Sequence, residues 1–337
     1  MNDRTLHVLV SGLVAYLMAS AGQGQTIKMA SVAPKDSPWH NALVDIGEQW
    51  KEISAGKVKL RIYPGGVVGD EPDMLRKIRI GQLHAAALST TGLISVTPDI
   101  EGLSFPLDVR TDEEMEAVIE RVGPIIEKQL EERGFKVLTW TLTGWVHFFS
   151  KERVLTPDDL RHRKLFFWGS DSAYVGLLKK LGFQPVSLTL TDLLPSLQTG
   201  LVDTFGAPPV AALSFQWFGM AKHMSSMRWQ PMPGMVVIST KQWSRIPAEY
   251  RPAMEKAARD VGAALRVRAR ELEEEAVKVM QDHGLTVHTT PPEAEEEFRA
   301  LLKEHGFPIF IGKRFSREVH DEVKAALEDL RNQPAVE

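Results

Sequence analysis

Strand-like and helix-like segments alternate through the first two thirds of the chain. The clearest strand is Lys57 to Ile62, where apolar and polar residues alternate strictly, as a half-buried strand requires. Before it, Asn41 to Ile53 has the pattern of a helix, and after it Met74, Leu75 and Ile78 share one helical face. Strands alternating with helices form parallel β-α-β units. The sequence therefore predicts an α/β fold.

The chain has 337 residues, which at roughly 150 residues per domain predicts two domains. The last third is helical in pattern, with predicted helices at Glu249 to His283, Pro292 to His305 and Ser316 to Asn332. Lys136 to Thr141 and Phe148 to Val154 are predicted as two separate strands. We expect two α/β lobes braced by C-terminal helices.

Charge and composition exclude several classes of protein. The chain carries 40 basic and 44 acidic side chains, a formal charge of −4, which disfavours binding to nucleic acid. Hydrophobic residues make up 43%, which rules out intrinsic disorder. There are no cysteines, so disulfides, thiolate nucleophiles and cysteine metal ligands are excluded.

The N-terminus has the order of a secretory signal peptide. Arg4 precedes the apolar run Leu6 to Ala19, and Ala19-Ser20-Ala21 supplies the small residues of a cleavage site. A buried helix or an uncleaved anchor is the alternative. We expect residues 1–21 to be removed and the mature protein to be periplasmic.

The motifs of known catalytic sites are absent from the sequence. No G-x-S-x-G, G-x-x-x-x-G-K-[ST], G-x-G-x-x-G or H-E-x-x-H motif occurs, and His283 and His288 do not share one helical face. We therefore expect neither an enzyme nor a bound metal or cofactor. A secreted hydrolase or lyase, with acid–base groups brought together from distant positions, remains the alternative.

Aromatic side chains are the best candidates for a binding cleft. Trp145, His147 and Phe149 alternate along one predicted strand and should share one face, as should Phe166 and Trp168 on the next. Tryptophan and histidine carry a polar group that needs a partner. Trp145, His147, Trp168 and Trp217 are therefore predicted to line a cleft rather than the core.

Five segments resemble one known family. They are Gly56 to Glu71 (GKVKLRIYPGGVVGDE), Met74 to Leu88, Asp159 to Phe167, Leu197 to Asp203 (LQTGLVD) and Lys241 to Pro247. In order and spacing they are similar to the solute-binding subunits of TRAP transporters, the DctP family. The resemblance spans roughly Ile27 to Asn332.

This resemblance implies a two-lobed periplasmic binding protein fold with a hinge. Lobe I would comprise residues 26–142 with 232–262, and lobe II residues 143–231 with 263–337. The protein would capture an organic acid or related small metabolite and deliver it to the membrane permease subunits of a TRAP transporter, as a monomer or homodimer. The ligand-binding residues implied are Trp39, His40, Thr90, Thr91, Trp145, His147, Phe166, Trp168, Pro208, Gln216 and Trp217.

The sequence departs from the family where most members bind a carboxylate. Phe166 stands where most members have an arginine, Val146 where many have a second one, and Ala207-Pro208-Pro209 where an asparagine is usual. We therefore expect a ligand with an apolar or aromatic part stacked among Phe166, Trp145 and Trp168, with His147 or hydroxyl groups holding any acidic group. Alternatively, another arginine such as Arg228 restores the clamp.

Overall fold

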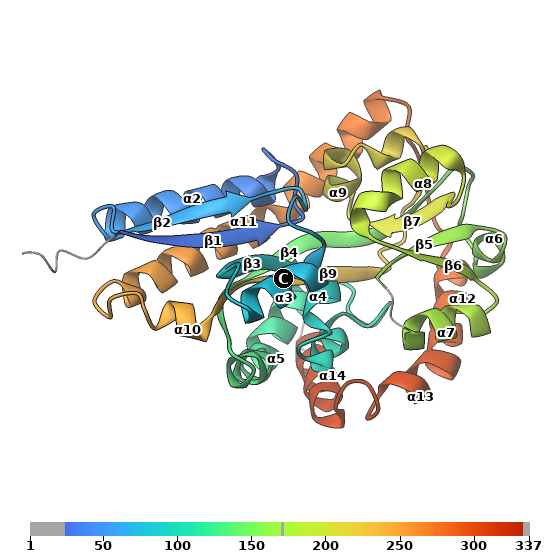
Figure 1. Ribbon diagram of the computed structural model, residues 1–337. Coiled ribbons are helices and arrows are strands. Elements are labelled where there is room, and N and C mark those ends of the chain that lie inside the picture. Colours follow the sequence, from blue (N-terminus) through green and yellow to red (C-terminus); the bar gives the residue numbers. More distant parts are fainter. Residues whose placement is uncertain (1–23, 170–171, 333–337) are drawn as a thin grey trace, which may run out of the picture.

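One ten-stranded sheet runs through both lobes of the computed structural model, in the order β2-β1-β3-β9-β4-β7-β5-β6, with β8 and β10 at the side of β4 (Figure 1). The structure describes residues 24–169 and 172–332, so the predicted signal peptide lies outside the described residues. The strands are β1 (Gln25–Ser31), β2 (Val58–Tyr63), β3 (Ala85–Ser89), β4 (Phe135–Ser150), β5 (Lys164–Trp168), β6 (Gln184–Leu188), β7 (Thr204–Ala207), β8 (His223–Ser225), β9 (Gln230–Ser239) and β10 (Thr286–His288).

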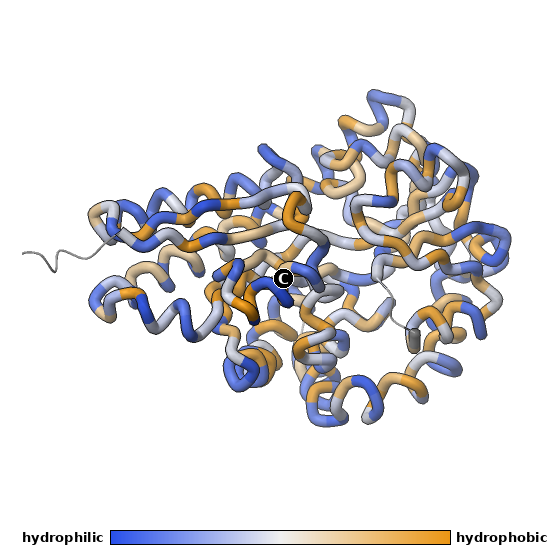
Figure 2. Tube along the Cα trace, viewed as in Figure 1, coloured by the Kyte–Doolittle hydropathy of each residue, from blue (hydrophilic) through white to orange (hydrophobic). Residues whose placement is uncertain are grey.

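Helices cover both faces of this sheet. Hydrophobic and hydrophilic residues alternate along them (Figure 2), as in α2, where Leu43, Ile46 and Trp50 are buried. The α-helices are α2 (Pro38–Ile53), α3 (Glu71–Arg79), α4 (Thr90–Leu93), α5 (Asp112–Glu132), α6 (Pro157–Arg161), α7 (Ser172–Lys180), α8 (Leu193–Thr199), α9 (Pro209–Ser214), α10 (Thr240–Trp243), α11 (Arg251–Asp282), α12 (Pro292–Leu301), α13 (Phe307–Phe310) and α14 (Arg317–Arg331). Shorter helical turns are η1 (Pro98–Ser104), η2 (Leu190–Asp192), η3 (Trp217–Gly219) and η4 (Leu302–Gly306).

The predicted parallel units are confirmed in both lobes. In the first lobe β1 pairs in parallel with β2 and β3, and in the second β5 pairs in parallel with β6 and β7. The lobes are joined by β4 and β9, which pair with each other and with their neighbours in antiparallel fashion. The long helix α11 packs on β4, on α2 of the first lobe and on α9 of the second, and so braces both.

The prediction of two strands at Lys136 to Thr141 and Phe148 to Val154 is wrong, because β4 is continuous from Phe135 to Ser150. The segment between the two predicted strands contains Gly144, whose φ of 126° is a conformation that favours glycine. The pairing of β4 with β9 shifts register beside it, between Leu142 and Trp145. The lobe boundary proposed at residues 142 and 143 falls at this irregularity and stays a prediction.

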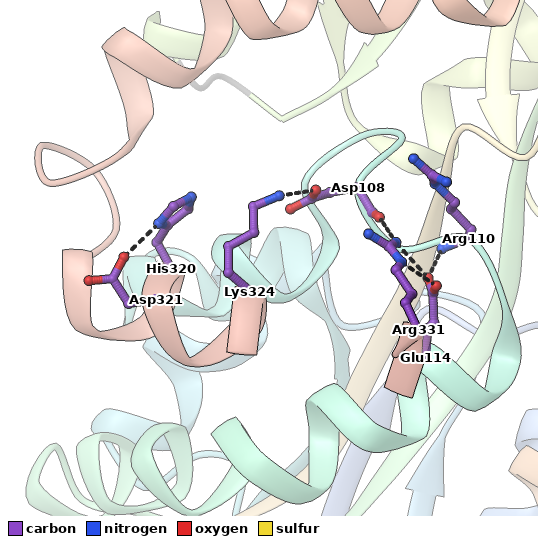
Figure 3. A network of polar contacts seen from close by, with 7 residues as sticks. All are labelled: Asp108, Arg110, Glu114, His320, Asp321, Lys324 and Arg331. Atoms are coloured by element: carbon purple, nitrogen blue, oxygen red, sulfur yellow. Dashed lines mark hydrogen bonds and ion pairs between the residues drawn. The ribbon is translucent and has the colours of Figure 1, made fainter. Parts of the chain in front are cut away.

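The C-terminal helix α14 packs on α5 of the first lobe, although the sequence places residues 263–337 with the second. Ion pairs hold it there: Arg331 Nε lies 2.7 Å from Glu114 Oε1, and Lys324 Nζ lies 2.6 Å from Asp108 Oδ1. Figure 3 shows these side chains reaching from α14 to the loop before α5 and to its first turn. Glu114 Oε2 also accepts from the backbone N–H of Arg110, which fixes that loop.

Candidate functional site

A cavity of about 540 Å³ lies between the two lobes. The first lobe contributes the loop after β1, the start of α2 and α3, and the end of β3 with α4. The second lobe contributes β5, the end of β7 and α9, while the crossing strands β4 and β9 complete the wall. The volume lies within the range of small-molecule binding sites.

Glu71 forms a buried polar centre in the first-lobe wall. It is the first residue of α3 and is 1% exposed. Its Oε1 accepts from Ser89 N, and its Oε2 accepts from Ser89 Oγ and Gly92 N, each at 2.8 Å. A side chain at Gly92 would place Cβ 2.6 Å from Glu71 Oε2, so this contact needs glycine. Burial raises the pKa of Glu71 to about 7.

Asp70 connects the two lobes with a single carboxylate. Its Oδ1 caps α3 by accepting from Glu71 N at 2.8 Å. Its Oδ2 accepts from the indole Nε1–H of Trp168 at 3.0 Å and from the backbone N–H of Leu190 at 3.3 Å, both in the second lobe. We call these two hydrogen bonds the Asp70 latch, because they join the first lobe to the second.

Aromatic rings form much of the second-lobe wall. Phe166 and Trp168 lie on β5, and Phe215 and Trp217 follow α9. The rings of Phe215 and Trp217 are stacked, with centroids 4.4 Å apart and an interplanar angle of 5°. Such rings suit a flat or apolar ligand.

Seven of the predicted site residues line the cavity. They come from α2, α4, β5 and the turn around α9: Trp39, Thr90, Thr91, Phe166, Trp168, Pro208 and Trp217. Thr90 is already engaged, because its hydroxyl donates to Pro233 O on β9 at 2.9 Å. Direct ligand contact by these seven residues stays a prediction.

Trp145 and His147 do not line the cavity, which corrects the prediction. Their neighbours Val146 and Phe148 line it instead, since alternate residues of a strand face opposite sides. Trp145 is 1% exposed, and its Nε1–H donates to Asp112 Oδ1 at 2.7 Å. His147 Nδ1 donates to Ser225 O at 3.1 Å, and burial lowers the pKa of the imidazole to about 4. His147 lies outside the wall and its Nδ1–H is already used, so it does not meet an acidic group in the cavity.

His40 and Gln216 also lie outside the cavity wall. His40 Nδ1 accepts from Asp36 N at 3.2 Å and so closes the loop at the start of α2. Gln216 is an exposed turn residue with a φ of 60° between α9 and η3. Both flank a tryptophan that does line the cavity, Trp39 on α2 and Trp217 in η3.

Several residues of the wall are not among the predicted site residues. They are the two carboxylates Glu71 and Glu101 and the apolar or aromatic residues Val146, Phe148, Tyr174 and Trp229. Alternation along β4 was the available signal for Val146 and Phe148. Glu101 forms an ion pair with Arg314, and burial raises its pKa against the effect of that guanidinium. No local sequence pattern connects two residues so far apart.

Arg228, the proposed replacement clamp, lies outside the wall. Its guanidinium sits 5.1 Å from the centroid of the Trp145 ring. There it attracts the buried carboxylate of Glu273, which accepts a hydrogen bond from Trp145 N. Burial nevertheless raises the pKa of Glu273 to about 7.

Neither a cluster of metal-ligating side chains nor a membrane-spanning helix occurs in the part of the chain that the structure describes. Residues 24–169 and 172–332 contain no group of three or more His, Asp or Glu side chains arranged to hold a metal ion. No helix in the same ranges is long and apolar enough to cross a membrane.

Comparisons with known proteins agree with this architecture. The 2,3-diketo-L-gulonate-binding periplasmic protein YiaO of Escherichia coli is 22% identical over 260 residues, covering 77% of this chain and 79% of its own. A TRAP periplasmic solute-binding protein of Ralstonia eutropha with bound (S)-2-acetolactate superposes with a TM-score of 0.84 at 23% identity, over 90% of this chain and 99% of that one. The sugar acid binding protein of Advenella mimigardefordensis in complex with galactonate gives 0.85 at 19% identity, over 91% and 99%.

The family model described as bacterial extracellular solute-binding protein, family 7, matches residues 29–306. Its members are binding proteins of TRAP transporters, so the alternative of a secreted hydrolase or lyase is not supported. With its two lobes and the cavity between them, the chain belongs to the DctP family of TRAP solute-binding proteins and is not an enzyme.

Proposed function

We propose that this protein captures an organic acid or a related small metabolite with an apolar or aromatic part, in the periplasm, and delivers it to the membrane permease subunits of a TRAP transporter. The observation that carries the proposal is the cavity between the lobes, walled by Phe166, Trp168 and Trp217 and closed by the Asp70 latch. The relatives named above hold small organic acids in the corresponding fold.

Capture requires the lobes to open and close around the solute. β4, β9, α11 and the segment between α12 and α14 pass between the lobes, so these are the elements that must bend. Closure would bury the Trp168 ring against both lobes and change its fluorescence. The predicted periplasmic location and the predicted monomer or homodimer are part of the same proposal.

Native mass spectrometry of the protein from its periplasmic fraction tests this function. We expect a bound small molecule, and we expect that adding it back to stripped protein changes the tryptophan fluorescence. The same spectrum reports monomer or dimer. Conversion of the molecule to a product, or an absence of binding across a broad metabolite set, would contradict the proposal.

A further inference from the structure

The cavity offers no cation to a bound solute. Among the described residues that line it there is no lysine, arginine or histidine, and the only carboxyl groups are those of Glu71 and Glu101. Arg228 stacks on Trp145 outside the wall, and Arg314 is paired with Glu101. A carboxylate placed in this cavity would therefore have no side chain of opposite charge to pair with.

The two positions at which family members carry an arginine are both part of the wall. Val146 on β4 and Phe166 on β5 line the cavity, and each is less than a tenth exposed. The change in the sequence is thus a change in the binding surface itself: an apolar side chain replaces a guanidinium at each point.

Backbone donors do not replace the missing cations. The start of α9 faces the cavity, but Pro208 and Pro209 have no N–H group to offer there. At the start of α4, the N–H groups of Ser89 and Gly92 already donate to Glu71. The chain's own carboxylate therefore already uses these two donors.

We infer that the solute of this cavity carries no charge and is held mainly by its apolar or aromatic body. An anion would lose its hydration without compensation. A cation would find both carboxylates engaged, Glu71 by three hydrogen bonds and Glu101 by Arg314. Hydroxyl groups of the wall, such as those of Thr141 and Thr143, suit a neutral polar group. The inference rests on the proposed function and narrows its class of solute.

Three probes that share one ring and chain test the effect of charge. Calorimetry at neutral pH compares 3-phenylpropan-1-ol, 3-phenylpropanoate and 3-phenylpropan-1-ammonium, with succinate and galactonate as further acids. We expect the alcohol to bind at least about tenfold more tightly than either charged analogue, since one hydrogen bond to a charged group is worth at least that factor. Tightest binding by any acid or by the ammonium would overturn the inference.

A substitution in the cavity wall tests the inference independently. Phe166→Arg should reverse the preference, so that 3-phenylpropanoate binds about tenfold more tightly than the alcohol. Phe166→Met, which removes the ring but adds no charge, should keep the order found in the unmodified protein. An unchanged order in Phe166→Arg, with folding verified by circular dichroism, would show that Phe166 does not face the bound solute.

If none of the probes binds, the charge of the molecule that co-purifies with the protein tests the inference instead. A neutral compound supports the inference, and an acid or an amine overturns it while leaving the proposed function intact. Failure of the proposed function is distinct: no compound of any charge binds or co-purifies, and the lobes do not close.

Discussion

Replacing Asp70 by asparagine should open the two lobes in the absence of any solute. The side chains are isosteric, and asparagine is as good a helix N-cap as aspartate, so α3 keeps its first hydrogen bond. The atom that faces the second lobe changes from an acceptor to an NH₂ donor. Trp168 Nε1–H and Leu190 N–H would then meet a donor instead of the carboxylate oxygen that now accepts both.

The magnitude follows from those two hydrogen bonds. Each joins a neutral donor to a charged acceptor at the partly exposed edge of the cleft, where water competes in the open state. A net value of about 1 kcal/mol for each gives about 2 kcal/mol for the latch. The ratio of open to closed protein should therefore rise by a factor of about 30.

Two measurements report this change without a ligand. The chain has eight tryptophans, so ¹⁵N labelling gives eight indole resonances, and Trp168→Phe identifies the relevant one. In Asp70→Asn its N–H should exchange with water more than tenfold faster, and small-angle scattering should show a larger radius of gyration. Trp50 Nε1–H, which donates to Met254 O within the first lobe, is an internal reference that should not change.

Asp73→Asn is the matched control, because Asp73 lies on the same helix and pairs only locally with Arg76 at 2.8 Å. It removes the same charge without touching the second lobe. If the two variants behave alike, or if Asp70→Asn leaves both the exchange of Trp168 and the scattering unchanged, then Asp70 does not hold the lobes together.

Four further results are expected. Gly144→Ala should lower the free energy of unfolding by about 2–4 kcal/mol in urea titrations, because its φ is 126° and the new Cβ would lie 2.2 Å from Glu273 Oε1. The control is Gly176→Ala, whose new Cβ has no atom within 4 Å and which should not lower the free energy of unfolding. The pKa of Glu273 is raised from 4.5 to about 7, so the folded state holds its proton to higher pH and stability falls as pH rises between these values. Glu273→Gln should remove that part of the pH dependence, on the order of 3 kcal/mol, and an unaltered pH profile would refute the assignment. Arg331→Gln should destabilise the protein by about 1 kcal/mol and raise amide exchange in α14, measured by mass spectrometry; protection equal to that of the unmodified protein would show that its ion pair is dispensable. Intact mass of the periplasmic protein should show cleavage after Ala21, and a chain that keeps residues 1–21 would contradict the predicted signal peptide.

Much of the fold was accessible from sequence because local patterns determine local structure. Alternation in Lys57 to Ile62 and the helical spacing after it were enough to predict parallel units, and β1, β2 and β3 confirm them. The continuity of β4 was not accessible, since a glycine in a strand pattern indicates a break as readily as a bulge. Only the contact with Glu273 on α11 shows why the chain continues through Gly144.

The candidate site was predicted less completely, and the reason is geometric. Residues at the start of a helix or in a short helical turn, such as Trp39, Thr90 and Trp217, were correctly predicted to line the cavity. On β4, the residues that line the cavity are those on the face turned toward it. Misjudging that face by one residue exchanges the lining residues for their buried neighbours. Glu71 has the appearance of an ordinary acidic residue in the first turn of a helix until its hydrogen bonds with Ser89 are seen.

The core of the first lobe joins residues from opposite ends of the chain. Ala30 on β1 and Leu327 on α14 belong to the same buried cluster, together with residues of α3, α5 and β9. Closing that cluster requires contacts between segments almost the whole chain apart, which makes folding slow relative to a protein with local contacts. The first lobe cannot complete its packing on the ribosome before the last helix has been synthesised. A first lobe that completes its packing late leaves more time for the chain to pass through a narrow translocation pore, which suits a protein predicted to be exported.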